Sequence, residues 1–267
     1  MDAYWLEQTN SDVPSGDWWL SESECARQGG LHIPKRRSDW RLGRWTAKHA
    51  VAVYLNLPRS QPVLAGVELR PAPSGAPKVF LRGRTAPVHL SLSHSHGVGL
   101  CAIVRAGAEV GCDLETVEAR SPIFVADYFT DDEQELVRRA PAVSRDQVVT
   151  LLWSIKESVL KALGCGLRSD TRSVNAAPAD YLNSHGDGWF PVSAAHDGGS
   201  QFYGWWRVSE DLVRTIVMEG RGCQNSTTTL PKAPDSTSAC AAPISLAEKW
   251  RSLRSGLSFP ESTNSAA

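Results

Sequence analysis

A stretch of twenty residues without glycine or proline, from Ser144 to Leu163, is the strongest constraint on the fold of this chain. Its apolar residues recur at helical spacing, the capping-box pattern Ser144-x-x-Gln147 stands at its start, and Gly164 follows its end. These features predict a helix of about five turns. On this helix Glu157 and Lys161 are four residues apart, so their side chains share one face.

Two further acidic residues belong to a predicted strand upstream of this helix. Hydrophobic residues alternate along Val110–Glu115, which is typical of a strand with one buried face. Because side chains on a strand alternate between its two faces, Asp113 and Glu115 project from the same face. Cys112 and Leu114 then point into a core.

The three carboxylates of Asp113, Glu115 and Glu157 predict a site for a hard cation. Magnesium prefers oxygen ligands and commonly combines a few carboxylates with water and phosphate oxygens, and manganese accepts the same ligands. We therefore predict a Mg²⁺ site that handles a diphosphate, with Mn²⁺ as an alternative. Each acidic motif taken alone is more often a solvated strand end or an ordinary helix ion pair, so the prediction depends on their combination.

A third segment, His89 to Gly97, carries alternating hydrophobic residues followed by Ser-His-Ser-His-Gly. Hydroxyls, imidazoles and loop amides at the end of a strand are suited to binding a phosphate group. Ser93 beside His94 also suggests a serine hydrolase. Neighbours on a strand point to opposite sides, however, and the chain has no Gly-x-Ser-x-Gly motif, so the hydrolase interpretation is disfavoured.

The order of these segments resembles the 4′-phosphopantetheinyl transferases of the surfactin-synthetase type. The matching motifs are Ser-His-Ser at 93–95, Gly-x-Asp-x-Glu at 111–115 and Trp-Ser-x-Lys-Glu-Ser-x-x-Lys at 153–161. The resemblance covers roughly residues 15 to 220. It implies an α+β fold of two similar halves, related by pseudo-two-fold symmetry, with the active site between them.

The resemblance also implies an activity. Such enzymes transfer the 4′-phosphopantetheine group of coenzyme A to a serine of an acyl or peptidyl carrier protein and release adenosine 3′,5′-bisphosphate. By this resemblance Asp113, Glu115 and Glu157 would hold Mg²⁺. Glu157 would also accept the serine proton, and Lys161 would assist the leaving phosphate.

A basic segment from Pro34 to Lys48 resembles the N-terminal helix of the same family. By resemblance Arg36 and Arg44, helped by Ser93 and His94, would bind the 3′-phosphate of coenzyme A. The alternative for the neighbouring Arg41 and Lys48 is a solvated basic helix face. Relatives often carry Gly-Lys-Pro before the Ser-His strand; here the stretch reads Gly-Ala-Pro-Lys at 75–78, and Lys78 is a possible substitute.

We predict three segments along the chain: an N-terminal α+β half that binds coenzyme A (1–106), a C-terminal α+β half with the metal and catalytic motifs (107–222), and a flexible tail with a short helix beginning near Leu246 (223–267). The pattern Trp-x-x-Lys-x-x-Val occurs at 45–51 and again at 153–159, which suggests a duplication. The predicted strands are Pro62–Arg70, Val79–Arg82, His89–Ser93, Val98–Val104, Val110–Glu115, Gly188–Ala194, Gln201–Val208 and Leu212–Met218.

Between the acidic strand and the long helix, the capping box Thr130-x-x-Glu133 predicts a helix that ends before Pro141. Arg138, Arg139 and Arg145 follow in this region and are expected to contact an acidic carrier protein.

The composition limits the classes of partner. Lys and Arg number 28 against 29 Asp and Glu, so the chain has no basic excess for nucleic acid. No apolar run reaches the length of a membrane span and the first residues carry no basic signal region, which predicts a cytoplasmic protein. Cys101 and Cys112 lie in strand patterns and are expected to be reduced, buried thiols. By resemblance we expect a monomer.

Two other functions remain open at this level. A Mg²⁺-dependent phosphohydrolase could use the same three carboxylates with water as the acceptor. A non-catalytic relative that only binds coenzyme A would have lost the metal ligands or the proton acceptor, whereas Asp113, Glu115, Glu157 and Lys161 are all present.

Overall fold

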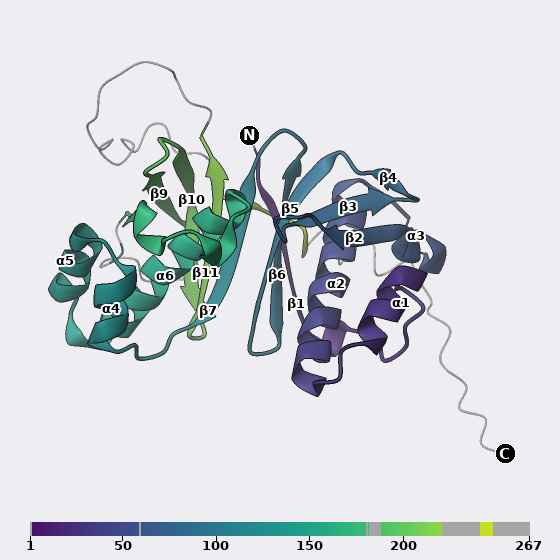
Figure 1. Ribbon diagram of the computed structural model, residues 1–267, viewed down its shortest axis with the longest axis horizontal. Helices are drawn as coiled ribbons and strands as arrows, with labels where there is room; N and C mark the ends of the chain where they lie inside the picture. The colour runs from purple at the N-terminus through teal and green to yellow at the C-terminus, as the bar shows by residue number, and fades with distance from the viewer. Residues whose placement is uncertain (1, 59, 180, 182–187, 221–240, 248–267) are drawn as a thin grey trace.

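A computed structural model describes residues 2–58, 60–179, 181, 188–220 and 241–247. Two larger sheets face each other in the middle of the molecule, and helices cover their outer faces (Figure 1). The predicted α+β class is confirmed. The helices are α1 (Glu22–Gly29), α2 (Pro34–Tyr54), α3 (Gln61–Gly66), α4 (Pro122–Tyr128), α5 (Asp131–Arg139) and α6 (Arg145–Ala162), with 3-10 turns at Asn10–Asp12, Ala142–Ser144, Gly166–Arg168 and Thr171–Ser173.

The first sheet has the strand order β12-β1-β6-β5 and the second the order β7-β11-β10-β9-β8. All neighbours are antiparallel except β12 and β1. The first sheet comprises β1 (Tyr4–Thr9), β5 (Val88–Ser95), β6 (Val98–Arg105) and β12 (Ile244–Ser245). The second comprises β7 (Val110–Thr116), β8 (Val174–Pro178), β9 (Phe190–His196), β10 (Gln201–Ser209) and β11 (Leu212–Glu219). A small sheet contains β2 (Val67–Pro71), β3 (Pro77–Leu81) and β4 (Arg84–Thr85).

Helix α6 confirms the predicted long helix, but its start differs from the prediction. Ser144 makes no capping hydrogen bond to the helix, so the predicted capping box with Gln147 is wrong. Ser144 instead closes a 3-10 turn and its hydroxyl donates to the carbonyl of Pro141. At the other end Gly164 adopts a left-handed conformation (φ +69°), which ends the helix as predicted.

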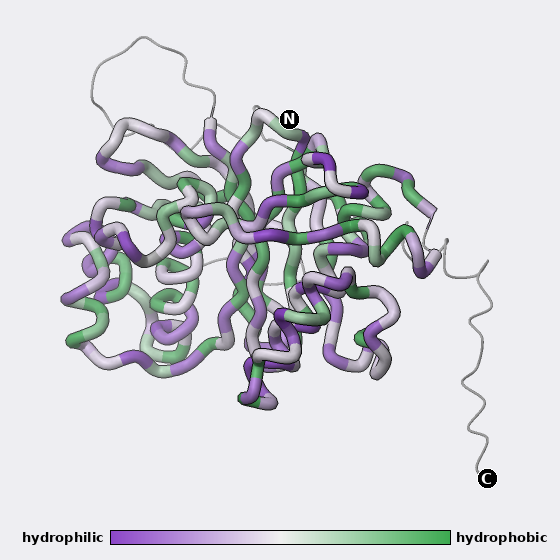
Figure 2. Tube along the Cα trace, turned by 45° about the vertical axis from the view of Figure 1, so that its right-hand side comes forward, coloured by the Kyte–Doolittle hydropathy of each residue, from purple (hydrophilic) through white to green (hydrophobic). Residues whose placement is uncertain are grey.

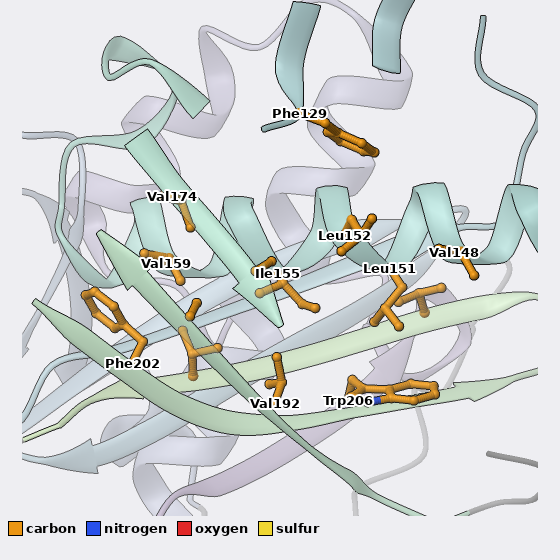
Figure 3. Close-up of a cluster of buried hydrophobic side chains, with 14 of the residues drawn as sticks. Phe129, Val148, Leu151, Leu152, Ile155, Val159, Val174, Val192, Phe202 and Trp206 are labelled. Carbon is orange, nitrogen blue, oxygen red and sulfur yellow. The ribbon is translucent and has the colours of Figure 1, made fainter. Parts of the chain in front are cut away.

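Helix α6 packs on the second sheet through its apolar stripe. Leu151, Ile155 and Val159 lie over strand residues that include Val192 and Phe202, as Figure 3 shows. The helix also comes very close to β7. A Cβ added at Gly111 would stand 1.7 Å from the Ser158 carbonyl oxygen, so only glycine fits at that position of the strand.

Helix α2 covers the first sheet in the same way. It confirms the predicted N-terminal basic helix, with Pro34 in its first turn where a missing N–H costs nothing. Ala47, Ala50 and Val51 enter the core between this helix and the sheet.

Lys48 of α2 is completely buried and holds several segments together. Its ammonium lies 2.6 Å from Glu24 Oε2 and donates to the carbonyls of Leu64 (2.9 Å) and Val67 (2.5 Å). The second oxygen of Glu24 accepts the amide of Leu69 at 3.2 Å. Lys48 is therefore a structural residue rather than part of a solvated face.

Lys156 of α6 makes the same set of contacts in the second sheet's half of the molecule. Its ammonium lies 2.7 Å from Glu133 Oε2 and donates to the carbonyls of Thr171 (2.9 Å) and Val174 (2.5 Å). Glu133 in turn accepts the amide of Ala176 at 2.7 Å. The repeated Trp-x-x-Lys pattern thus marks two equivalent lysines, although a pseudo-two-fold relation of the whole halves stays a prediction.

The predicted strands agree with the structure except at one segment. Residues 62–66, predicted as the start of a strand, belong to helix α3, and only Val67 onwards is extended. Pro62 lies in the first turn of that helix, where proline is favoured. The Leu64 carbonyl of the same helix accepts a hydrogen bond from the Lys48 ammonium. Strands β1, β4, β8 and β12 were not predicted; β4 and β12 have only two residues each, and β1 pairs with residues distant in sequence.

The two sheets meet along β5 and β7, where side chains replace a regular strand ladder. The amide of Cys112 donates to the Ser91 hydroxyl at 3.0 Å. Beside this contact Leu100, Leu114 and Ile216 form a shared apolar core between the sheets. Hydrophobic and hydrophilic residues alternate along β5, whereas β6 is hydrophobic from Leu100 to Val104, and both green and purple stretches run through the middle of the molecule in Figure 2.

The segment 241–247 returns to the first sheet after a stretch that lies outside the described residues. Ile244 and Ser245 pair with β1, and Leu246 is buried in the core under α2. Most of the predicted tail from residue 223, including almost all of the short helix expected to begin near Leu246, lies outside the described residues. Within the described part of the chain, no helix is both long and apolar enough to cross a membrane.

Candidate functional site

Three of the predicted site residues meet at the junction of β5, β7 and α6. The Lys161 ammonium lies 2.7 Å from Asp113 Oδ1 and 3.1 Å from the Ser93 hydroxyl, and the Ser93 hydroxyl donates to Asp113 Oδ1 at 2.8 Å. Lys161 also donates to the Cys112 carbonyl at 3.2 Å. Each of the three elements therefore contributes one side chain to a connected polar group.

Asp113 is only 3% exposed and has one carboxylate oxygen left over. Its Oδ1 takes both hydrogen bonds, while the buried Oδ2 has no hydrogen-bond partner among the described residues. Burial by itself would lower the pKa of Lys161, but the charge and hydrogen bond of Asp113, together with the charges of Cys112 and Glu157, outweigh it and raise the pKa, so Lys161 stays protonated.

Glu115 lies two residues further along the same face of β7. It accepts a hydrogen bond from the indole of Trp153 at 3.3 Å, and the Arg120 guanidinium is 4.0 Å away. Burial and then the nearby charge of Asp113 raise the pKa of Glu115 to about 7. The charge of Arg120 and the hydrogen bond from Trp153 act to lower the pKa of Glu115 and only partly counteract that shift.

Glu157 is half-buried on α6, one turn before Lys161. Its pKa is raised, first by burial and then by the charge of Asp113, and Lys161 acts in the opposite direction. The charge of Asp113 therefore disfavours the ionisation of both Glu115 and Glu157. Such a concentration of acidic groups is typical of a functional site.

The acidic residues fit the ligand chemistry of a hard cation. A cation beside Asp113 Oδ2 would supply the partner that this oxygen lacks and would relieve the repulsion felt by Glu115 and Glu157. Within the described residues no group of three or more His, Cys, Asp or Glu side chains is positioned to hold a metal ion as it stands. The metal ligand set stays a prediction that the donor chemistry favours.

A cavity of about 480 Å³ opens beside Lys161. It is lined from the first sheet's half by Arg44 of α2 and His94 of β5, and from the other half by Lys161 and the glycines that follow α6. A volume of this size is within the roughly 300–1,000 Å³ of small-molecule sites. Arg44, His94 and Lys161 thus share one cavity between the two sheets' halves, whereas Glu157 and the other two acidic residues are not among its lining residues.

Arg36 lines an adjoining cavity of about 420 Å³. The two cavities share Asp39, Trp40 and His94 as lining residues. Arg44 stacks on the Trp40 ring at 5.1 Å and lies 3.8 Å from Glu24. Burial lowers the pKa of Arg44, and the charge of Glu24 opposes that effect.

Two residues of the predicted coenzyme-binding set have other contacts. Ser93 does not line either cavity, because its side chain turns to Asp113 and Lys161 while His94 points the opposite way. Lys78 is also absent from the cavity walls, which Gly75, Ala76 and Pro77 line instead. Arg41 lies on the α1 side of α2, where it pairs with Asp17 and donates to Gln28 at 2.8 Å.

Sequence reasoning missed Arg27, which also lines the larger cavity. It lies on α1, a helix opened by the capping box Ser21-x-x-Glu24. That capping box was a readable signal for the helix. The approach of α1 to α2, which brings Arg27 to the cavity, depends on the buried Glu24–Lys48 pair and is not visible in sequence.

The end of the Ser-His segment forms a tight turn. Strand β5 continues through Ser95, and His96 and Gly97 take left-handed conformations. The His96 ring nitrogen lies 2.7 Å from the Thr116 hydroxyl at the end of β7. This turn therefore ties β5 to β7 just beyond the acidic residues.

Comparisons with known proteins find similarity to one enzyme family. Residues 109–189, which contain all three acidic positions, match the family model of the 4′-phosphopantetheinyl transferase superfamily. The chain is 29% identical over 164 residues to the 4′-phosphopantetheinyl transferase HetI of Nostoc sp. (strain PCC 7120), covering 61% of this chain and 67% of that protein. It is 26% identical over 191 residues to the putative 4′-phosphopantetheinyl transferase slr0495 of Synechocystis sp. (strain PCC 6803), covering 68% and 74%. These findings support a 4′-phosphopantetheinyl transferase of this superfamily, without singling out the surfactin-synthetase type.

Proposed function

We propose that this chain is a Mg²⁺-dependent 4′-phosphopantetheinyl transferase of the surfactin-synthetase type. It would transfer the 4′-phosphopantetheine group of coenzyme A to a serine of an acyl or peptidyl carrier protein. The observation that carries the proposal is the position of Lys161, which lines the cavity and at the same time holds Asp113. A diphosphate ligand that contacts Lys161 in that cavity would lie close to Asp113, which Lys161 bonds.

In this proposal the basic residues of the cavity bind the nucleotide end of coenzyme A. Arg44 and His94 line the larger cavity and Arg36 the adjoining one, so their donors can reach a phosphate group from two sides. Ser93 acts from the other side of β5, by holding Asp113 and Lys161 in place.

The reaction is an attack of the serine oxygen on the phosphorus that carries the pantetheine arm. The bond from that phosphorus to the leaving adenosine 3′,5′-bisphosphate breaks, and Glu157 accepts the serine proton, a role that its raised pKa suits. Lys161, kept protonated by Asp113, stabilises the negative charge that develops on the leaving phosphate. Mg²⁺ held by Asp113, Glu115 and Glu157 would neutralise the charge of the diphosphate.

The surface beside α4 is the proposed site for the carrier protein. Ile123 of α4 is 71% exposed, and the Tyr128 ring lies 5.5 Å from that of Trp153, which bonds Glu115. Arg145 is exposed at the start of α6. The two other predicted contacts, Arg138 and Arg139, both pair with Glu135, which lowers their net attraction for an acidic carrier.

The decisive test is intact-protein mass spectrometry of a purified apo carrier protein after incubation with this chain, coenzyme A and Mg²⁺. A mass gain of one phosphopantetheine group that EDTA abolishes would support the proposal. Cleavage of coenzyme A with no gain on either acyl or peptidyl carriers would instead indicate the phosphohydrolase. Intact coenzyme A and no gain on any carrier would contradict both activities and indicate a protein that only binds coenzyme A. The three-segment organisation, the monomeric state and the cytoplasmic location stay predictions.

A further inference from the structure

Three buried hydroxyl groups connect α6 to β11 directly behind the acidic residues. The Thr215 hydroxyl lies 2.9 Å from that of Ser154 and 2.6 Å from that of Ser158. It also donates to the Ser154 carbonyl at 3.0 Å. All three side chains are fully buried. A hydroxyl has one proton and two lone pairs, so the contacts of Thr215 use its full capacity.

This hydroxyl cluster of Ser154, Ser158 and Thr215 lies in register with the candidate site. Thr215 is the direct partner of Asp113 in the β7–β11 ladder, so both side chains project from the sheet toward α6. Ser154 and Ser158 are one turn apart on α6 and bracket Glu157. The cluster therefore joins the turn that carries Glu157 to the position opposite Asp113.

Two features indicate that the cluster sets a position and does not merely fill space. The close approach of Gly111 to the Ser158 carbonyl leaves no room for α6 to shift toward β7. The hydroxyl contacts oppose both sliding of the helix along its axis and rotation about it, because Ser154 and Ser158 both bond the same Thr215 hydroxyl. Apolar packing alone tolerates small sliding movements, whereas a saturated hydrogen-bond network specifies one arrangement.

We propose that Thr215 is a positioning residue, which sets the place of Glu157 and Lys161 relative to Asp113 through the hydroxyls of Ser154 and Ser158. The proposal rests on the proposed transferase function for its kinetic consequences. Reactive groups must be held within about 0.5 Å of their productive geometry, and a displacement of about 1 Å can lower a rate a hundredfold. Thr215 itself touches neither cavity, so it has no direct part in binding coenzyme A.

The test replaces Thr215 with valine, which has the same shape but no hydroxyl. We expect Thr215→Val to lower kcat about 10- to 100-fold, with KM for coenzyme A changed by less than about twofold. Thr215→Ser restores the hydroxyl and should recover kcat to within about threefold of the unchanged protein. Binding of Mn²⁺ alone, measured by electron paramagnetic resonance, should weaken about tenfold in Thr215→Val.

Thr150→Val is the matched control. Thr150 is a buried threonine on the same helix, and its hydroxyl has no hydrogen-bond partner within the described part of the chain. Its replacement should leave kcat and Mn²⁺ binding unchanged. If Thr215→Val does not fold by circular dichroism, Ser154→Ala removes one member of the cluster and should lower kcat in the same direction.

Several results would overturn the inference. Wild-type kcat and Mn²⁺ affinity in a folded Thr215→Val variant would do so, as would an equal loss in Thr150→Val. Absence of transfer by the unmodified protein would count against the proposed function instead. In that case the Mn²⁺ measurement alone decides the positioning role, since it needs no carrier protein.

Discussion

Lys161 of α6, which lines the candidate cavity, and Asp113 of β7 are 48 residues apart in sequence and form a 2.7 Å ion pair. The pair has a division of roles. One oxygen of Asp113 keeps Lys161 protonated and in place, and the other is buried without a partner among the described residues. Asp113 therefore holds the Lys161 ammonium with one oxygen and leaves the other oxygen as an acceptor for a cation.

Asp113→Asn tests this division. The amide keeps the size of the carboxylate but removes its charge, so Lys161 loses its counter-ion and the proposed metal loses a ligand. We expect transfer to fall by at least about a hundredfold, with coenzyme A affinity within a few-fold of wild type. Isothermal titration calorimetry would measure the affinity.

The control for that variant is Asp146→Asn, at the exposed first turn of α6. It removes one negative charge from the same helix, and Asp146 is not among the residues that line the cavity. Equal losses in the two variants would show that overall charge, rather than the Lys161 contact, explains the effect.

Glu157→Gln should abolish transfer while coenzyme A still binds. The change removes the proposed proton acceptor and a proposed metal ligand together, whereas the basic residues that line the cavities are untouched. Stopped reactions followed by mass spectrometry of the carrier would measure turnover. A glutamine variant that transfers at the wild-type rate would remove Glu157 from the chemistry.

The local patterns of the sequence were sufficient to predict the two principal helices and the acidic strand. Asp113 and Lys161 could be placed on the correct faces because the strand and helix periods determine which side chains project together. The meeting of those faces is confirmed by their ion pair. The partner of Asp113 on the third element, Ser93, was expected to face a phosphate and instead bonds the carboxylate.

What the sequence could not provide was long-range. Where β5 meets β7, the Ser91 hydroxyl accepts a hydrogen bond from the Cys112 amide, and no periodicity of the sequence encodes such a contact. Residues 62–66 form a short apolar run, and such runs do not distinguish a strand from a helix until tertiary contacts decide. Ser144 matched a capping pattern, but the 3-10 turn after Pro141 uses it differently.

Arg44 and Arg41 are neighbours on α2 and should respond differently to removal. Arg44 lines the cavity, so Arg44→Ala should raise KM for coenzyme A about tenfold or more with little change in kcat, as expected when a remote binding contact is lost. Arg41 pairs with Asp17 and stacks on Trp19, so Arg41→Ala should lower Tm and leave KM unchanged. A large fall in kcat at constant KM for Arg44→Ala would place Arg44 in the chemistry.

The cysteines should differ in reactivity with iodoacetamide at pH 8. Burial raises the pKa of Cys112 to about 11 and also raises that of Cys101 well above the usual range of a thiol, so neither forms a thiolate at that pH in the folded chain. Cys25 is exposed and should be alkylated first. Peptide mapping before and after unfolding in guanidinium would measure this, and rapid labelling of folded Cys112 would contradict its buried position.

The equivalent lysines Lys48 and Lys156 predict equivalent losses of stability. Lys156→Met leaves the fully buried Glu133 without its counter-ion and frees two carbonyls, which should lower the free energy of unfolding by about 3–5 kcal/mol. Lys48→Met should cost a similar amount through Glu24. Lys35→Met breaks an exposed i,i+4 pair with Asp39 and should change stability by less than about 0.5 kcal/mol. Urea unfolding would compare the three, and a Lys156 variant as stable as the Lys35 variant would show that the buried pair does not hold α5 to α6.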